Sequence, residues 1–282
     1  MTTPTSHGVD SKFSLDLLTT RKAFAVYAVI FTIYIYLPIL SLIGFSFNEG
    51  GLTYPFVGFT LDWYGELLAN QSMMAAIERS LLLAFATMVI TTILATAMAI
   101  AYRRDFVGKR AILFLLILGI ITPGITYGVG ATLFLNEILG LSKSLWLALT
   151  VHVVWTLPFS FIVLLAGFPP TLGQNERAAR VMGADNLTVF RKIIFPQIAP
   201  TVLGAAVFAF TLSYNESTRG LLILGQENTM PLEVFAIAGS RRPTPELFAL
   251  GSITTIVSTI LLGITGIIVF RSIRRVRGDD DE

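Results

Sequence analysis

The sequence predicts an all-α membrane protein with six transmembrane helices, and three observations lead to that fold class. The chain has 282 residues, of which 54% are hydrophobic and only 13% charged, with a mean hydropathy of +0.74. A soluble domain would carry about 25% charged residues. Six apolar stretches approach the roughly 20 residues that a helix needs to cross a bilayer. Lys and Arg gather on alternate loops between those stretches.

The expected spans cover residues 23–46, 80–102, 111–135, 145–168, 198–214 and 247–270. Arg21 and Lys22 precede the first span and no small-residue cleavage site follows it, so we expect a retained helix rather than a removed signal peptide. Pro123 in the third span and Pro158 in the fourth each remove a helix hydrogen bond and predict kinks. Such kinks suit the wall of a pathway or simple helix packing. The fifth span ends in the polar run Ser-Tyr-Asn-Glu at 213–216.

The placement of basic residues predicts the orientation. Of the 20 Lys and Arg residues, 15 fall on the side of the two termini and five on the other side. Because loops rich in Lys and Arg stay in the cytoplasm, both termini are expected there. The expected organisation is a cytoplasmic tail over 1–22, a membrane domain over 23–270 and a second cytoplasmic tail over 271–282. The loop over 169–197 would also face the cytoplasm.

That loop contains a predicted helical hairpin. Glu176 to Met182 is rich in Ala and Arg, which favour helix, and Gly183 follows where a left-handed cap would end it. Asp185 or Asn186 would cap a second helix, which Pro196 is expected to close. The apolar positions of this second helix recur at helical spacing: Leu187, Val189, Phe190, Ile193 and Ile194. The hairpin suits either the surface of the lipid headgroups or a groove on a cytoplasmic partner.

The sequence of the hairpin also resembles a known family motif. Ala178-Ala179, then Gly183-Ala184, Phe190, Ile193 and Pro196, resemble the EAA loop of bacterial ABC-importer permeases. In that family the loop forms the coupling helix, which docks on the ATPase subunit. One position departs from the pattern, because Arg177 stands in register with the family's glutamate while Glu176 precedes it. Adjacent helical positions differ by about 100° around the axis, so the carboxylate is rotated away from the family's position.

The resemblance covers most of residues 30–270. It includes the stretches YLPILSLIGFSFN, FTLDWY, RRDFVGKR, ITPGI, HVVWTLPF and FTLSYNES. Over this length the chain is similar to the second permease subunits of spermidine/putrescine-type importers. The resemblance implies the transmembrane domain of a type I ABC importer in a bacterial inner membrane. It also implies a second homologous permease, two cytoplasmic ATPase subunits and an extracytoplasmic solute-binding protein as partners. The residues expected to couple to the ATPase are Glu176, Arg177, Ala178, Ala179, Gly183, Ala184 and Pro196.

The sequence lacks the motifs for ATP binding, metal binding and catalysis. No GxxxxGKS/T sequence is present to cradle ATP phosphates, so ATP and Mg²⁺ would be bound by a partner ATPase. The chain has no cysteine, only two histidines (His7 and His152), and no HExxH motif. We therefore predict no catalytic residue, no metal site and no cofactor in this chain. The net charge of +2 does not indicate a nucleic-acid partner, because the basic residues serve the membrane orientation. His152 is expected at the membrane interface or bonded to a neighbouring helix.

Polar residues after the fifth span predict the substrate pathway or its gate. The candidates are Tyr214, Asn215, Glu216 and Arg219, together with Pro123 and Pro158. Residues 220–245 are too short and broken to cross, and suit either a re-entrant segment at the outer rim or an ordinary solvated loop. Polyamine-type relatives usually carry two adjacent acids here, whereas this chain has Asn215 and then Arg219 within one helical turn. The cargo is therefore expected to be a polyamine or a non-polyamine solute, such as an amino-acid derivative, an opine-like compound or another zwitterion or anion. A passive channel or membrane scaffold is the alternative from another class.

Overall fold

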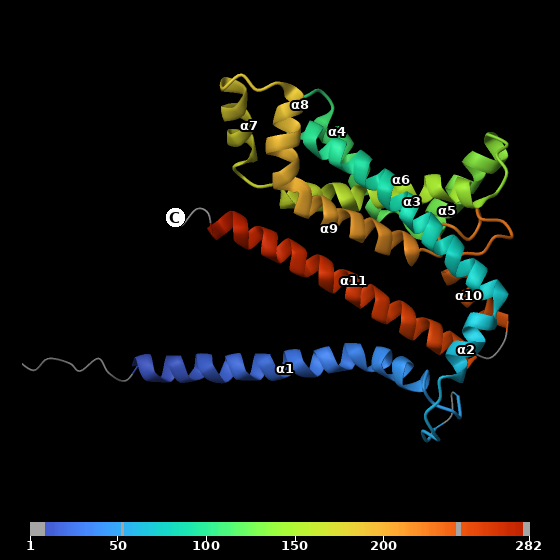
Figure 1. Ribbon diagram of the computed structural model, residues 1–282. Coiled ribbons are helices and arrows are strands. Elements are labelled where there is room, and N and C mark those ends of the chain that lie inside the picture. The colour runs from blue at the N-terminus through green and yellow to red at the C-terminus, as the bar shows by residue number, and fades with distance from the viewer. Residues whose placement is uncertain (1–8, 52–53, 241–243, 279–282) are drawn as a thin grey trace, which may run out of the picture. The chain divides into compact units, whose positions relative to one another are not determined.

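The computed structural model describes residues 9–51, 54–240 and 244–278, and within these ranges every named element is a helix (Figure 1). Five helices are long and apolar enough to cross a membrane, and a bent helix pair raises the number to six. The predicted fold class, an all-α membrane protein with six spans, is confirmed. The chain divides into two compact units, of which one comprises residues up to Glu66 together with Thr244–Ile253.

The first unit is dominated by α1 (Val9–Phe45). This helix begins well before the expected start of the first span, inside the stretch expected to be a tail. Its side chains from 20 to 41 are exposed within the unit. A short loop follows, in which the buried Asn48 side chain accepts a hydrogen bond from the Val57 amide at 2.9 Å and donates one to the Gly51 carbonyl at 2.9 Å. The loop leads into α2 (Asp62–Ala69), which continues into the second unit.

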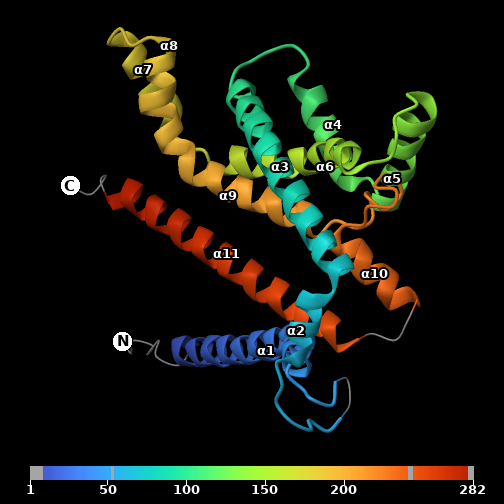
Figure 2. The ribbon, with the colours of Figure 1, turned by 45° about the vertical axis from the view of Figure 1, so that its right-hand side comes forward.

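Three helices form the core of the second unit: α3 (Gln71–Tyr102), α6 (Leu145–Gly167) and α9 (Phe195–Tyr214). They pack directly on one another, as Figures 1 and 2 show. Small side chains lie fully buried along the contact and allow the backbones to approach closely. They are Ala76, Ala84, Ala95, Ala99, Ala205 and Ala209. Thr91 and Thr156 share a buried hydrogen bond of 2.8 Å between α3 and α6.

The third span is broken, as Pro123 predicts. It consists of α4 (Lys109–Ile121), α5 (Gly124–Thr132) and the π-helix η1 (Leu133–Ile138). The two halves are bent by 106° at the break. Pro123 occupies the N-cap of α5 with an extended backbone, where its missing N–H is no loss.

The fifth span differs from the expectation. The prediction that Pro196 closes the second hairpin helix is wrong, because helix runs without interruption through α8 (Asn186–Val189), η2 (Phe190–Ile194) and α9. The reason is the π-helix η2, which ends at Ile194, two residues before the proline. There the regular hydrogen-bond ladder is already widened, so Pro196 is accommodated at the start of α9.

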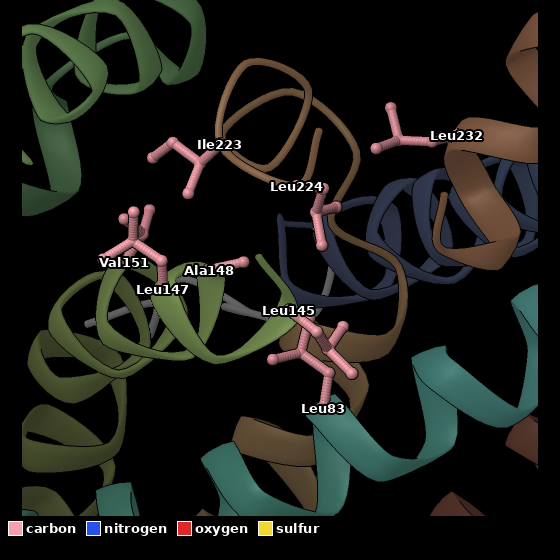
Figure 3. Packing of buried hydrophobic residues seen from close by; sticks show 8 residues of the cluster. All are labelled: Leu83, Leu145, Leu147, Ala148, Val151, Ile223, Leu224 and Leu232. Carbon is pink, nitrogen blue, oxygen red and sulfur yellow. The ribbon is translucent and has the colours of Figure 1, made fainter. Parts of the chain in front are cut away.

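The segment after α9 packs against helices α3 and α6 of the second unit. It forms turns up to residue 226 and then α10 (Met230–Ser240). Figure 3 shows Ile223, Leu224 and Leu232 of this segment in one apolar cluster with residues of α3 and α6. The Ser144 amide donates to the Ile223 carbonyl at 3.1 Å. An ordinary solvated loop is therefore not what the structure has here.

The last helix is α11 (Pro245–Gly278), which contains the expected sixth span and continues through the start of the expected C-terminal tail. Its first nine residues belong to the first unit and the rest to the second. The residues 241–243, which end the predicted outer-rim segment, lie outside the described residues. The cytoplasmic location of both tails stays a prediction.

Candidate functional site

The predicted hairpin forms a compact knuckle, made by α7 (Leu172–Val181), the turn that follows it, and α8. Gly183 has φ +84°, a left-handed conformation that favours glycine. The Gly183 amide donates to the Arg180 carbonyl and the Ala184 amide to the Ala179 carbonyl, both at 3.0 Å. This pair of bonds is the Schellman helix ending, so the predicted glycine cap is confirmed. Asp185 caps α8 by accepting from the Leu187 amide at 3.2 Å.

One side of the knuckle is apolar and packs inward. The buried cluster there comprises Leu172, Ala179 and Val189 of the knuckle together with Ile194 of η2 and Ile198 of α9. Ala179 is only 4% exposed and Ala184 packs against the same cluster, so the small residues serve the close approach of α7 to α8 and η2. Ala178 points outward and is exposed, as is Pro196 at the membrane end of the knuckle.

The tip of the knuckle exposes two apolar side chains that the sequence analysis did not select. Val181 is 88% exposed and Met182 81% exposed, directly before Gly183. No described residue lies within 4 Å of a β-carbon built on that glycine. The signal that would have found them is their position, because two apolar residues at the end of a polar helix lie outside its buried stripe. Exposed apolar groups at a projecting tip are typical of a docking surface.

The carboxylate of Glu176 holds the knuckle together from within the chain. It pairs with Arg103 at the end of α3 at 3.1 Å and with Arg180 of α7 at 3.1 Å. Arg180 in turn donates to the Asn186 side chain at 2.6 Å. The glutamate is thus committed to intramolecular partners, while the adjacent Arg177 is exposed and has no ion pair among the described residues.

The second group of predicted residues gathers around a buried ion pair. Arg219 donates from Nη1 to Oε2 of Glu216 at 2.7 Å, and its backbone amide donates to Oε1 at 2.8 Å. The side chains are only 11% and 5% exposed. The guanidinium carbon of Arg219 lies 4.1 Å from the centre of the Trp155 ring, which makes a close cation–π contact. Both charged groups are therefore neutralised inside the protein.

Small residues of α5 make room for this pair. A β-carbon built on Gly124 would lie 3.2 Å from Arg219 Nη1. One built on Gly128 would lie 3.2 Å from the Arg219 carbonyl oxygen, so the backbone after α9 approaches α5 closely. The break at Pro123 begins α5 at Gly124, and the start of this helix lies against Arg219. Pro158 is buried farther along α6, where its ring faces Gly119 of α4.

Polar atoms without partners surround the pair. His152 is buried and shares a hydrogen bond of 2.8 Å between its Nδ1 and the Ser213 hydroxyl. This agrees with the expectation that His152 bonds to a neighbouring helix. Among the described residues no hydrogen-bond partner reaches His152 Nε2, Trp155 Nε1 or Arg219 Nε. Trp155 and Ser213, which complete the cluster, were not among the named candidates. Ser213 opens the polar run at the end of the fifth span, whereas nothing local distinguishes Trp155 from other core positions.

The remaining two candidates lie at the edge of this cluster. Asn215 is exposed, and its side chain donates to the Thr211 carbonyl at 3.0 Å. The Tyr214 ring stacks on Phe210 with 5.8 Å between the ring centres. Of the predicted pathway residues after α9, Asn215 is the one that presents an exposed side chain. In the described part of the chain no three His, Asp or Glu side chains come together as a metal site would require.

Comparisons with known proteins agree with this arrangement. The model of a family described as binding-protein-dependent transport system inner membrane component matches residues 91–278. The chain is 30% identical to the spermidine/putrescine transport system permease protein PotC of Haemophilus influenzae, over 87% of this chain and 93% of that protein. It is 29% identical to the putrescine transport system permease protein PotI of Escherichia coli, over 84% of each chain.

A solved structure shares the fold. A bacterial ABC transporter involved in the import of the polysaccharide alginate matches with a TM-score of 0.65 and 19% identity, over 95% of this chain and 99% of that chain. A second crystal structure, of an amino acid ABC transporter, matches with a TM-score of 0.55 and 14% identity, over 76% of this chain and all of that chain. At these identities the likeness concerns the fold alone.

Proposed function

Because the chain belongs to the family of inner-membrane components of binding-protein-dependent transport systems, we propose that it forms half of the pathway of an ATP-driven polyamine importer. The other half would come from a second, homologous permease. The single observation that carries this proposal is the α7–α8 knuckle, whose exposed apolar tip of Val181 and Met182 is available to a partner. Two cytoplasmic ATPase subunits would each bind one such knuckle.

The division of labour follows from the sequence. The chain has no phosphate-binding loop, so ATP and Mg²⁺ belong to the partner ATPases. ATP binding would close the ATPase dimer, draw the two knuckles together and open the cavity outward, and hydrolysis would return it inward. Coupling requires the ATPase to interact differently with these two states, since a partner indifferent to them shifts no equilibrium. The knuckle and both termini would therefore lie in the cytoplasm, with a solute-binding protein on the other side.

The proposed cargo is a polyamine. The relatives named for spermidine and putrescine support this class. An exposed Arg219 would repel a polyamine, but its guanidinium is buried, paired with Glu216 and covered by the Trp155 ring. A cationic cargo would therefore meet little of its positive charge. Asn215, which stands where such relatives usually carry an acid, keeps a non-polyamine solute as the second candidate.

The test is ATP hydrolysis by the importer reconstituted with both permeases, its ATPases and its binding protein. The binding protein would be loaded in turn with putrescine, spermidine, amino-acid conjugates and other small organic solutes. Stimulation by the polyamines supports the proposal, whereas stimulation only by a zwitterion or an anion would replace the cargo. Solute flux that needs no ATP would instead favour a passive channel.

A further inference from the structure

A basic cleft lies between the knuckle and the cytoplasmic end of α3. Its volume is about 520 Å³, and its walls come from α3, α7, α8 and η2. The charged residues that line it are Arg103, Arg104, Glu176, Arg177 and Arg180. The lining thus has four positive side chains and one negative one, so the cleft has an excess of positive charge.

The single carboxylate is already used. Glu176 is bridged by Arg103 and Arg180, so its two oxygens face these two guanidinium groups. The guanidinium groups of Arg104 and Arg177 have no hydrogen bond or ion pair to any residue that the structure describes. A β-carbon built on Gly173 would lie 3.5 Å from Arg103 Nη2 and 3.7 Å from Arg177 Nη1, so two of the cations reach the same point of the wall. Like charges that converge on one point favour an anion between them.

We propose that this cleft receives a carboxylate side chain of the partner ATPase when that subunit docks on the knuckle. The proposal rests on the function proposed above. A guanidinium presents a planar fork of donors that matches a carboxylate, and the resulting bidentate pair adds geometric specificity to the contact. The cleft has four arginines and one carboxylate that is already paired, so the complementary partner charge is negative.

The position of the cleft selects the ATPase over other sources of negative charge. Arg180 lines the cleft and is directly followed by Val181 and Met182, the exposed tip of the knuckle. A partner that covers the tip therefore also covers the mouth of the cleft. The phosphate of an anionic lipid has the same charge, but it would occupy the cleft whether or not the ATPase is bound.

The experiment measures association of the ATPase with the permease pair in nanodiscs of phosphatidylcholine, from low to high salt. The test variant carries Arg104→Gln and Arg177→Gln, which remove the two unpaired cations and leave the Glu176 bridges intact. The matched control carries Arg191→Gln and Lys192→Gln, two exposed cations of η2 that do not line the cleft. We expect association of the test variant to weaken at least about tenfold at low salt and to lose most of its salt dependence, because charges at a docking surface act in this way. The control should lose less than about twofold.

A second arm identifies the partner group. Arg177→Glu should abolish ATP-driven uptake, and substitution of one acidic residue of the ATPase by lysine should restore it. Equal weakening in the test and control variants would overturn the proposal, since only general attraction would then be involved. An effect that appears only when phosphatidylglycerol is added would assign the cleft to a lipid headgroup and would also overturn it. If the wild-type importer shows ATP-driven uptake while the test variant binds the ATPase normally, this inference alone fails; without uptake by the wild type, the proposed function fails.

Discussion

Replacing Glu216 with glutamine is expected to destabilise the membrane bundle strongly, because it leaves Arg219 buried without its counter-ion. In the wild type the Arg219 amide donates to Oε1 of Glu216 at 2.8 Å, and the glutamine variant retains an oxygen that can accept this bond. It loses the charged partner of the guanidinium, which donates to Oε2 at 2.7 Å. Both side chains are almost fully buried, at 11% and 5% exposure, so solvent screens this pair little.

The magnitude follows from the burial of both groups. Removal of one partner from a buried ion pair costs about 3–5 kcal/mol, most of it the penalty for the charge left behind. The contact of Arg219 with the Trp155 ring exists before the substitution and remains after it, so it does not replace the lost counter-ion. Arg219 Nε has no hydrogen-bond partner among the described residues, so no nearby acceptor is in place to replace the lost carboxylate. We therefore expect a loss of about 3–5 kcal/mol in the free energy of unfolding.

The assay is the free energy of unfolding of the purified permease in mixed micelles, compared with polyamine uptake by the reconstituted importer. Glu216→Gln combined with Arg219→Met serves as the control, because replacing both charges of a buried pair is often nearly neutral. The double variant should be more stable than Glu216→Gln alone. Unchanged stability of Glu216→Gln together with a weakened response to polyamine would refute the reasoning and make Glu216 a cargo contact. Additive losses in the double variant would refute the coupling of the pair.

Four further predictions concern the knuckle and the topology. Gly183→Ala should cost about 1–2 kcal/mol, because it has open space for its methyl group but a strained φ of +84°. Gly183→Pro should abolish ATP-driven uptake in a transport assay, because proline fixes φ near −65°. The hydrogen bond from the Thr188 side chain lowers the pKa of Asp185 below its ordinary value of 3.8. The stabilising contribution of the Asp185 carboxylate should therefore be complete above pH 3.8 and lost as the pH falls through the lowered pKa. In thermal unfolding, the midpoint of the wild type should exceed that of Asp185→Ala above this range and approach it only within the acid range. Alkaline phosphatase fused after residue 226 should be active and after residue 282 inactive; the reverse would overturn the proposed orientation.

The features that sequence could predict are those decided by local chemistry. The length of the apolar stretches located the spans of α3 and α6 because a bilayer imposes a minimum length. Gly183 and Asp185 marked the ends of the two knuckle helices because each supplies a conformation or an acceptor that the helix end requires. Pro123 marked the break in the third span for the same reason, since it cannot donate to the helix ladder.

The features that escaped prediction depend on residues far apart in the chain. The burial of Arg219 requires the Trp155 ring of α6 and the glycines of α5, which no spacing pattern connects to it. The role of Glu176 depends on Arg103 at the end of another helix. The continuation of helix through Pro196 depends on the π-turn before it, whose sequence has no distinguishing pattern.

Two kinds of contact hold the knuckle to the rest of the second unit, and they differ in magnitude. The bridge between Glu176 and Arg103 is partly exposed, at 17% and 22%, and ion pairs near the surface contribute roughly 0–1 kcal/mol. The apolar contact beneath it buries five side chains completely or nearly so, from Leu172 to Ile198. Full burial of each larger one contributes about 1.5–3 kcal/mol. The apolar cluster therefore joins the knuckle to α9, while the ionic network sets its register against α3. If the proposed ATPase docks on the exposed tip, a displacement of the tip would be transmitted to α9 through the apolar cluster, and the charges would determine which partner binds.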